Sequence, residues 1–127
     1  MGELTMGVNW LAVIVGAVLA FLLGWLWFSP KLFGEKWAAG VGVTLNEGPP
    51  PGAAMGFQAV GNILLSVTIG ITAAANHLMM AILVVLTIVF LLVANGLFVQ
   101  KSRHAVSVEA GFVIAMAVVM IVVQAIL

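Results

Sequence analysis

The sequence lacks cysteine and tyrosine, and it contains no aspartate. The absence of cysteine excludes disulfides, thiolate nucleophiles and zinc–cysteine sites. Carboxylate chemistry is limited to four glutamates, and the two histidines are too few to hold a metal ion by themselves. No nucleophile, base and orienting group can be assembled from these residues. We therefore expect neither an enzyme nor a cofactor or metal site.

Charged residues are scarce as well. They make up 6% of the 127 residues, whereas 65% are hydrophobic, and a soluble domain carries roughly 25% charged residues. Because so few charged residues cannot cover the surface of a 127-residue protein in water, most of that surface must face lipid. The net charge of zero offers no basic surface for nucleic acid. The composition predicts an integral membrane protein.

Four apolar stretches are long enough to cross a bilayer, because a core about 30 Å thick needs a helix of about 20 apolar residues. They cover residues 8–28, 53–75, 78–99 and 105–127. The first is too long for the core of a secretory signal and has no basic residue before it, so we expect it to be retained. The prediction is an all-α, polytopic transmembrane domain over residues 1–127, with four helices arranged as two hairpins.

The basic residues lie in only two connections. Lys31 and Lys36 follow the first span, and Lys101 and Arg103 precede the last. The positive-inside rule therefore places loops 29–52 and 100–104 in the cytoplasm and both termini outside. We expect a multi-pass protein of the cell (inner) membrane.

The first of these loops divides into two parts. Ser29 and Pro30 read as an N-cap followed by proline at the first helical position. They predict a short interfacial helix over residues 30–39, with Trp37 on the membrane surface. The glycine- and proline-rich stretch 40–52 is expected to be a flexible cytoplasmic linker. The other tryptophans, Trp10, Trp25 and Trp27, are expected at the membrane interfaces.

Small residues recur every four positions in the first span. They are Ala12, Gly16, Ala20 and Gly24. Small residues at this spacing let helix backbones approach closely in lipid. The pattern predicts a helix-packing face, and it leaves open whether the neighbour belongs to the same chain or to another.

Polar side chains gather on one half of the second span. They are Gln58, Asn62, Ser66, Thr68, Thr72 and Asn76. In lipid this half must turn inward, because an unsatisfied polar group costs several kcal/mol. It forms either interhelical hydrogen bonds or one wall of a polar cavity. The middle of the bundle is nearly all apolar, so a continuous hydrophilic path is not indicated.

Glu109 is the only acid well inside a predicted span, which makes it a functional candidate. Lys101, Arg103 and Asn95 are the groups with which it could pair. The interpretations are a structural ion pair or cap at the positive end of the last helix, and a proton or cation site. The candidate polar site comprises Glu109, Asn95, Gln58 and Asn62.

Several motifs occur together in the sequence. They are Val8-Asn9-Trp10, the run from Ser29-Pro30 through Phe33-Gly34 to Trp37, Asn95-Gly96-Leu97-Phe98, and Gly111-Phe112. This combination resembles an uncharacterised bacterial family of four-helix membrane proteins, over nearly the whole chain. The positions that carry the resemblance are Asn9, Trp10, Ser29, Pro30, Phe33, Gly34 and Trp37. The resemblance implies fold and location but no activity. Since the family more often has asparagine at the position of Glu109, no family-wide catalytic role is implied there.

These features suggest competing functions. The first is a structural or accessory subunit that self-associates or joins a larger membrane complex. The alternative is a small homo-oligomeric transporter or channel that uses Glu109. A membrane enzyme is the least favoured. The expected partners are the lipid bilayer and either further copies of the chain or other membrane subunits, with no nucleic acid.

Overall fold

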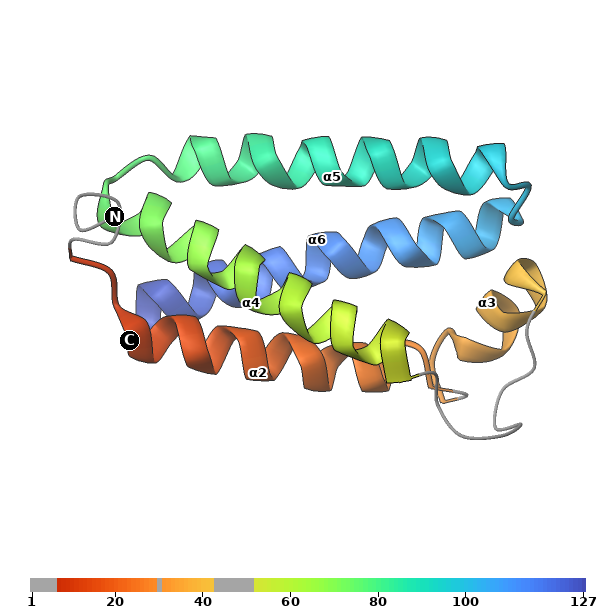
Figure 1. The fold of residues 1–127 in the computed structure, drawn as a ribbon, viewed down its shortest axis with the longest axis horizontal. Coiled ribbons are helices and arrows are strands. Elements are labelled where there is room, and N and C mark those ends of the chain that lie inside the picture. The colour runs from red at the N-terminus through yellow and green to blue at the C-terminus, as the bar shows by residue number, and fades with distance from the viewer. Residues whose placement is uncertain (1–6, 30, 43–51) are drawn as a thin grey trace.

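A computed structural model describes residues 7–29, 31–42 and 52–127. These residues form five helices, and no strand occurs among them. Four are long and apolar enough to span a membrane: α2 (Trp10–Trp27), α4 (Gly52–Ala74), α5 (Leu78–Phe98) and α6 (Arg103–Ile126). The fifth, α3 (Gly34–Val41), is short. The all-α fold with four membrane-length helices and a short helix after the first is confirmed (Figure 1).

Polar caps set the beginnings of two long helices. The Asn9 side-chain oxygen accepts a hydrogen bond from the Ala12 N–H at 3.1 Å, so α2 begins two residues later than predicted. The Ser102 hydroxyl likewise accepts from the Ala105 N–H at 3.0 Å. Residues 103 and 104, predicted as part of loop 100–104, therefore belong to the first turn of α6.

The predicted boundaries of the first loop are also corrected. Helix α3 begins at Gly34 rather than at residue 30, and it runs to Val41, into the predicted linker 40–52. It stops at Gly42, whose φ of 82° is the left-handed conformation that ends many helices. Helix α4 already begins at Gly52. Pro30 and the linker residues 43–51 lie outside the described residues.

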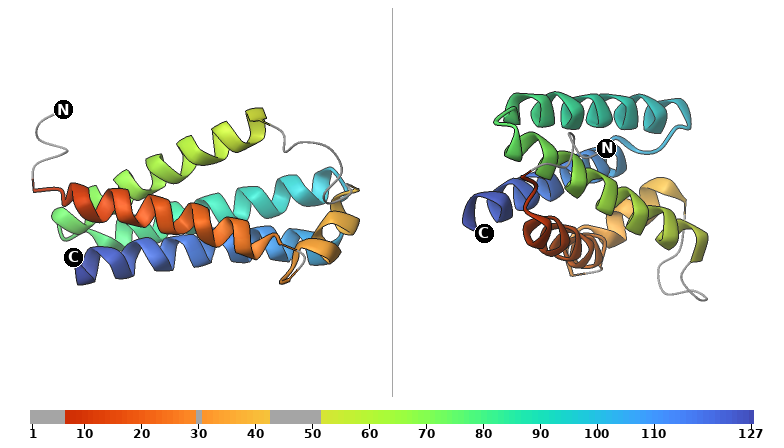
Figure 2. Two further views of the ribbon diagram at one scale, coloured as in Figure 1. Left: turned by 90° about the horizontal axis from the view of Figure 1, so that it is seen from below. Right: turned by 60° about the vertical axis from the view of Figure 1, so that its left-hand side comes forward.

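Helix α6 lies at the centre of the bundle and α5 at its edge. In the most apolar stretch of α6, 44% of the residues are buried, compared with 11% in α5. Helix α2 packs against both α4 and α6, whereas α5 packs mainly against α6. Helices α4 and α5 lie together at their shared turn and diverge toward the Gly52 end of α4 (Figure 2). The first turns of α4 are exposed as a result.

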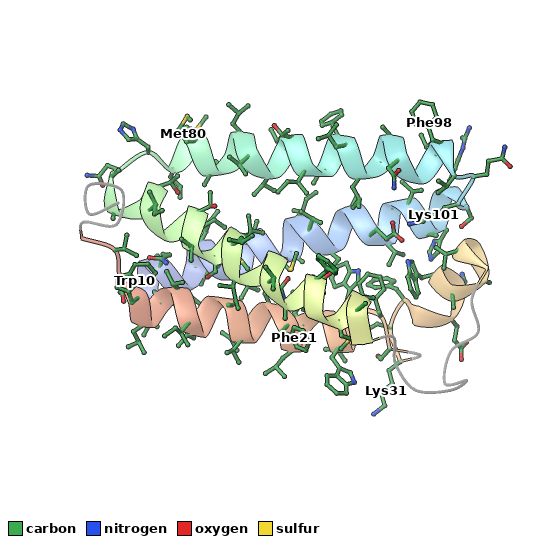
Figure 3. The ribbon with its side chains drawn as sticks, in the orientation of Figure 1. Trp10, Phe21, Lys31, Met80, Phe98 and Lys101 are labelled. Atoms are coloured by element: carbon green, nitrogen blue, oxygen red, sulfur yellow. The ribbon has the colours of Figure 1, made fainter. Side chains whose placement is uncertain are left out.

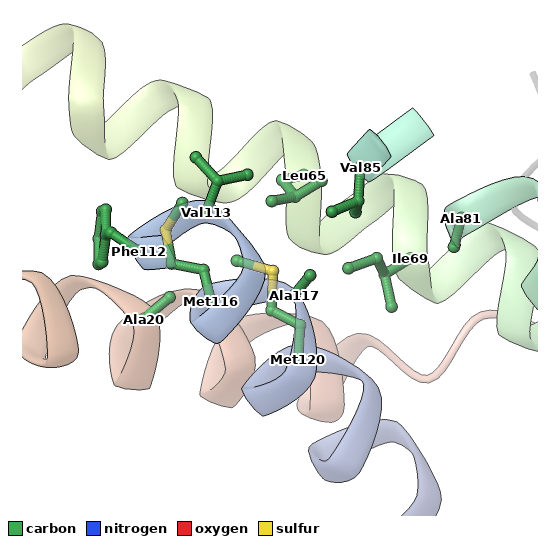
Figure 4. Close-up of a cluster of buried hydrophobic side chains, with 10 residues drawn as sticks. All are labelled: Ala20, Leu65, Ile69, Ala81, Val85, Phe112, Val113, Met116, Ala117 and Met120. Carbon is green, nitrogen blue, oxygen red and sulfur yellow. The ribbon is translucent and has the colours of Figure 1, made fainter. Parts of the chain in front are cut away.

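The core forms where α2, α4 and α6 meet. Ile69 of α4 and Met120 of α6 are fully buried in it. On α6 the core residues Phe112, Met116 and Met120 repeat every four positions, so they share one face of the helix (Figure 4). Val85 of α5 also belongs to this core, whereas the exposed side chains of α5, such as Met80 and Phe98, point away from it (Figure 3).

The small-residue face of α2 packs within this chain. Ala12, Gly16 and Ala20 are buried, and a Cβ on Gly24 would lie 2.8 Å from the Phe112 ring. At Gly16 a Cβ would lie 3.1 Å from the Ser66 hydroxyl of α4. The neighbours left open by the sequence are therefore α4 and α6. A bulky substitution at Gly16 or Gly24 would therefore disturb the packing of α2 within one chain, whether or not chains associate.

Candidate functional site

The turn between α2 and α3 is organised by Ser29. Its hydroxyl donates to the Leu26 carbonyl at 2.7 Å, and its own carbonyl accepts from the N–H groups of Leu32 and Gly34 at 3.1 and 2.9 Å. The predicted N-cap role of Ser29 is wrong, because Phe33 occupies the N-cap position and makes no side-chain cap bond. The chain needs residues 31–33 to complete the turn, which delays the start of α3.

The turn accepts only glycine at position 34. A Cβ there would overlap the Phe28 carbonyl oxygen and lie 2.7 Å from the Ser29 carbonyl carbon. Both obstacles are backbone atoms, which cannot rotate away as a side chain would. Gly34 therefore permits a backbone approach that no residue with a side chain allows.

Aromatic side chains fill the space between this turn and α6. The ring centroids of Trp27 and Phe33, and those of Phe28 and Trp37, are 4.9 Å apart, and those of Phe28 and Phe112 are 5.2 Å apart. The Trp27 indole N–H donates to the Val108 carbonyl at 3.0 Å. Trp10 and Trp25 are exposed, as interfacial residues would be, whereas Trp27 and Trp37 are turned inward. These aromatic contacts join the first loop to the last helix.

Glu109 is held by two groups from different parts of the chain. The Lys101 ammonium lies 3.0 Å from both carboxylate oxygens, and the Trp37 indole N–H donates to one of them at 2.9 Å. The side chain of Glu109 is 12% exposed and that of Lys101 is 26% exposed. Of the partners considered from the sequence, the structure selects Lys101. Trp37, which was predicted to lie on the membrane surface, is half-buried, and its indole N–H is turned toward Glu109.

A backbone contact ties the same elements together. The Ser102 N–H donates to the Gly40 carbonyl at 3.0 Å. A Cβ on Gly40 would overlap the Ser102 hydroxyl and lie 2.7 Å from the Ala105 Cβ. Together with Trp37 and Glu109, this contact fixes α3 against the α5–α6 loop and the first turns of α6. We call this junction the α3 clamp.

Gln58 and Asn62 lie apart from the α3 clamp, one turn from each other on α4. The Gln58 amide nitrogen donates to the Asn62 side-chain oxygen at 2.7 Å. Asn62 is 2% exposed, and its Nδ2 has no acceptor among the described residues. Further along α4, the Ser66 hydroxyl donates to the Val13 carbonyl of α2 at 2.7 Å. Thr68 and Thr72 instead donate to carbonyls of their own helix.

The four residues of the candidate polar site thus separate into different environments. Glu109 joins Lys101, and Gln58 joins Asn62. Asn95 is exposed on α5 and is not among the hydrogen-bond partners of Glu109 in the described part of the chain. His77 and His104 are exposed near opposite ends of the bundle. Within the described residues, no group of three potential metal-ligating side chains comes together.

Three hydrogen bonds that stabilise this arrangement were not predicted. Trp27 with Val108, Trp37 with Glu109, and Ser66 with Val13 are separated by 81, 72 and 53 positions. Periodicity shows which face of a helix turns inward but not which partner it meets. The one available signal was that an indole N–H in lipid requires an acceptor.

Comparison with known proteins agrees with the resemblance seen in the sequence. A family described as "Protein of unknown function (DUF1761)" matches residues 11–125, which include every described element from α2 to nearly the end of α6. No curated protein and no solved structure matches the chain. The match spans the α3 clamp and the Gln58–Asn62 pair alike. This four-helix chain belongs to the DUF1761 family.

Proposed function

We propose that this chain is a structural or accessory subunit of a membrane assembly, without catalytic activity of its own. It would associate with further copies of itself or with other membrane subunits, surrounded by lipid. The observation that carries the proposal is the environment of Glu109. Both carboxylate oxygens contact the Lys101 ammonium, and one also accepts from Trp37. This use of the acid favours holding α3 in place over carrying a cation.

The centre of the bundle supports the same proposal. Ala20, Ile69 and Met120 are buried there with no exposed surface or almost none. A transported ion or proton would need polar groups along its whole route. The buried polar side chains of the described residues, Asn62 and Ser66, lie four positions apart on α4 and do not extend across the core. The outer side of α5 offers a long apolar surface on which lipid or another transmembrane helix can pack.

Native mass determination tests the proposal after gentle extraction from the original membrane. We expect the chain in a complex of fixed stoichiometry, and a foreign subunit in that complex would identify the process it serves. The transporter alternative makes a different prediction: Glu109→Gln would abolish pH-dependent flux in proteoliposomes. A monomeric chain with flux that depends on Glu109 would contradict the accessory role.

We further propose that the end of the bundle that holds α3 faces the cytoplasm of a bacterial cell. The four basic residues, Lys31, Lys36, Lys101 and Arg103, all lie near this end, in or beside the connections of α2–α4 and α5–α6 (Figure 3 labels Lys31 and Lys101). The positive-inside rule then places the beginning of α2 and the end of α6 outside.

The absence of cysteine makes this orientation measurable. Lys36→Cys places a thiol on exposed α3, and Asn76→Cys places one in the exposed α4–α5 turn at the other end. In intact cells an impermeant maleimide should label the Asn76→Cys variant. It should leave the Lys36→Cys variant unlabelled until the membrane is opened. The reverse pattern would invert the proposed topology.

A further inference from the structure

A recess of about 370 Å³ lies between α4, α5 and α6. Its apolar lining includes Phe57 of α4, Ile88 of α5 and Met116 of α6. Gln58 and Asn62 contribute the polar groups. Most of its lining residues belong to α4. An apolar recess of this volume with a few polar groups has the character of a site for a small molecule.

Asn62 supplies the second observation. It is 2% exposed, and its Nδ2 has no acceptor among the described residues, while its oxygen is engaged by Gln58. An amide group left unsatisfied in an apolar environment costs several kcal/mol, because lipid provides no water to replace the missing partner. A ligand with an oxygen acceptor at this position would remove that penalty.

Charge and depth restrict the ligand. No residue that lines the recess is charged, so nothing there compensates a phosphate. Asn62 lies ten residues after Gly52, the first residue of α4, which is about 15 Å along the helix axis and half of a bilayer core about 30 Å thick. A charged headgroup belongs at the interface rather than at this depth. The ligand must therefore be uncharged.

Size restricts it further. A recess of about 370 Å³ holds roughly a dozen groups of the volume of a water molecule, about 30 Å³ each. A helix is about 10–12 Å across with its side chains, so it could cover the recess but not enter it. We propose that this recess binds an uncharged, single-chain lipid whose carbonyl oxygen accepts a hydrogen bond from Asn62. The site goes beyond the accessory role and does not depend on it.

Two glycines of α4 provide a matched pair of variants. A Cβ at Gly61 or at Gly56 would meet nothing within 4 Å, so both positions accept a larger side chain without a clash. Gly61 lines the recess, whereas Gly56 does not and lies about 140° away around the helix. Gly61→Leu should therefore fill the recess, and Gly56→Leu should leave it empty.

The test is a lipid titration of the delipidated full chain in detergent, followed by native mass spectrometry. The probe is 6-undecanone, an uncharged single-chain ketone of about a dozen non-hydrogen atoms whose carbonyl has no polar head group beside it, and the comparison lipid is dioleoyl phosphatidylglycerol. We expect one ketone to bind to the wild type and to Gly56→Leu with equal affinity. Gly61→Leu and Asn62→Leu should bind it about tenfold more weakly, the loss expected for about 1.4 kcal/mol.

Three results would overturn the proposal. They are equal binding of the ketone by all variants, tighter binding of phosphatidylglycerol than of the ketone, and a Gly61→Leu variant that changes oligomeric mass but still binds the ketone. The last would assign the recess to a protein partner. If Gly61→Leu fails to fold, the double variant Gln58→Leu with Asn62→Leu decides the question, because replacing both partners of their hydrogen bond by apolar groups can leave stability nearly unchanged.

Discussion

Gly34→Ala is expected to lower the melting temperature of the detergent-solubilised chain by about 10 °C or more. The added Cβ would overlap the Phe28 carbonyl oxygen and press on the Ser29 carbonyl carbon. Relief requires a backbone shift, for which overpacking costs of about 3 kcal/mol are typical, and a loss of that size lowers the melting temperature of a small domain by this amount. Circular dichroism melting measures it.

Gly56→Ala is the matched control for this substitution. Gly56 lies within α4, and a Cβ there would meet nothing within 4 Å. Alanine is a better helix former than glycine by about 0.8–1 kcal/mol, so this variant should melt at the same temperature as the wild type or slightly above it. A Gly34→Ala variant as stable as Gly56→Ala would show that the turn after α2 can relax around a methyl group.

The second large effect is expected at the ion pair of Lys101 and Glu109. Glu109→Gln and Lys101→Met should each destabilise the chain by about 2 kcal/mol, between the values for exposed and fully buried pairs, because each leaves a partly buried charge without its partner. The double variant removes both charges together. It should lose less than the two single losses combined, by about 1–2 kcal/mol.

Arg103→Met is the control for the ion pair. Arg103 is exposed at the start of α6, two residues from Lys101, and it forms no ion pair with Glu109 in the described part of the chain. Its replacement should change stability by less than about 0.5 kcal/mol. If the stability losses of the two single variants add up in the Lys101 and Glu109 double variant, the ion pair does not stabilise the position of α3.

Hydropathy was sufficient to predict the four long helices, since their existence depends on composition and length alone. Their ends depend on single hydrogen bonds. Asn9 and Ser102 cap α2 and α6, and those caps account for the differences from the predicted starts. The start of α3 was harder to predict, because Ser-Pro has the pattern of an N-cap. In the structure Ser29 instead closes a turn that precedes the helix.

The candidate site was predictable where its partners are close in sequence. Gln58 and Asn62 are four residues apart on one helix, and Lys101 and Glu109 are separated by one short turn and the start of α6. Asn95 was grouped with them as a possible partner of Glu109, but the sequence does not determine which side of α5 faces α6. The contact of Trp37 with Glu109 spans 72 positions, so only the packed structure reveals it.

The α3 clamp has a consequence for the order of events during synthesis. Helix α3 precedes α4 in the chain, but its hydrogen bonds go to Ser102 and Glu109. Glu109 follows Trp37 by 72 positions, and contacts of such long range form late. The first loop must therefore wait beside the membrane until α6 has been inserted. Insertion of the last helix therefore completes the contacts of α3, and before that event Trp37 and Gly40 lack their hydrogen-bond partners.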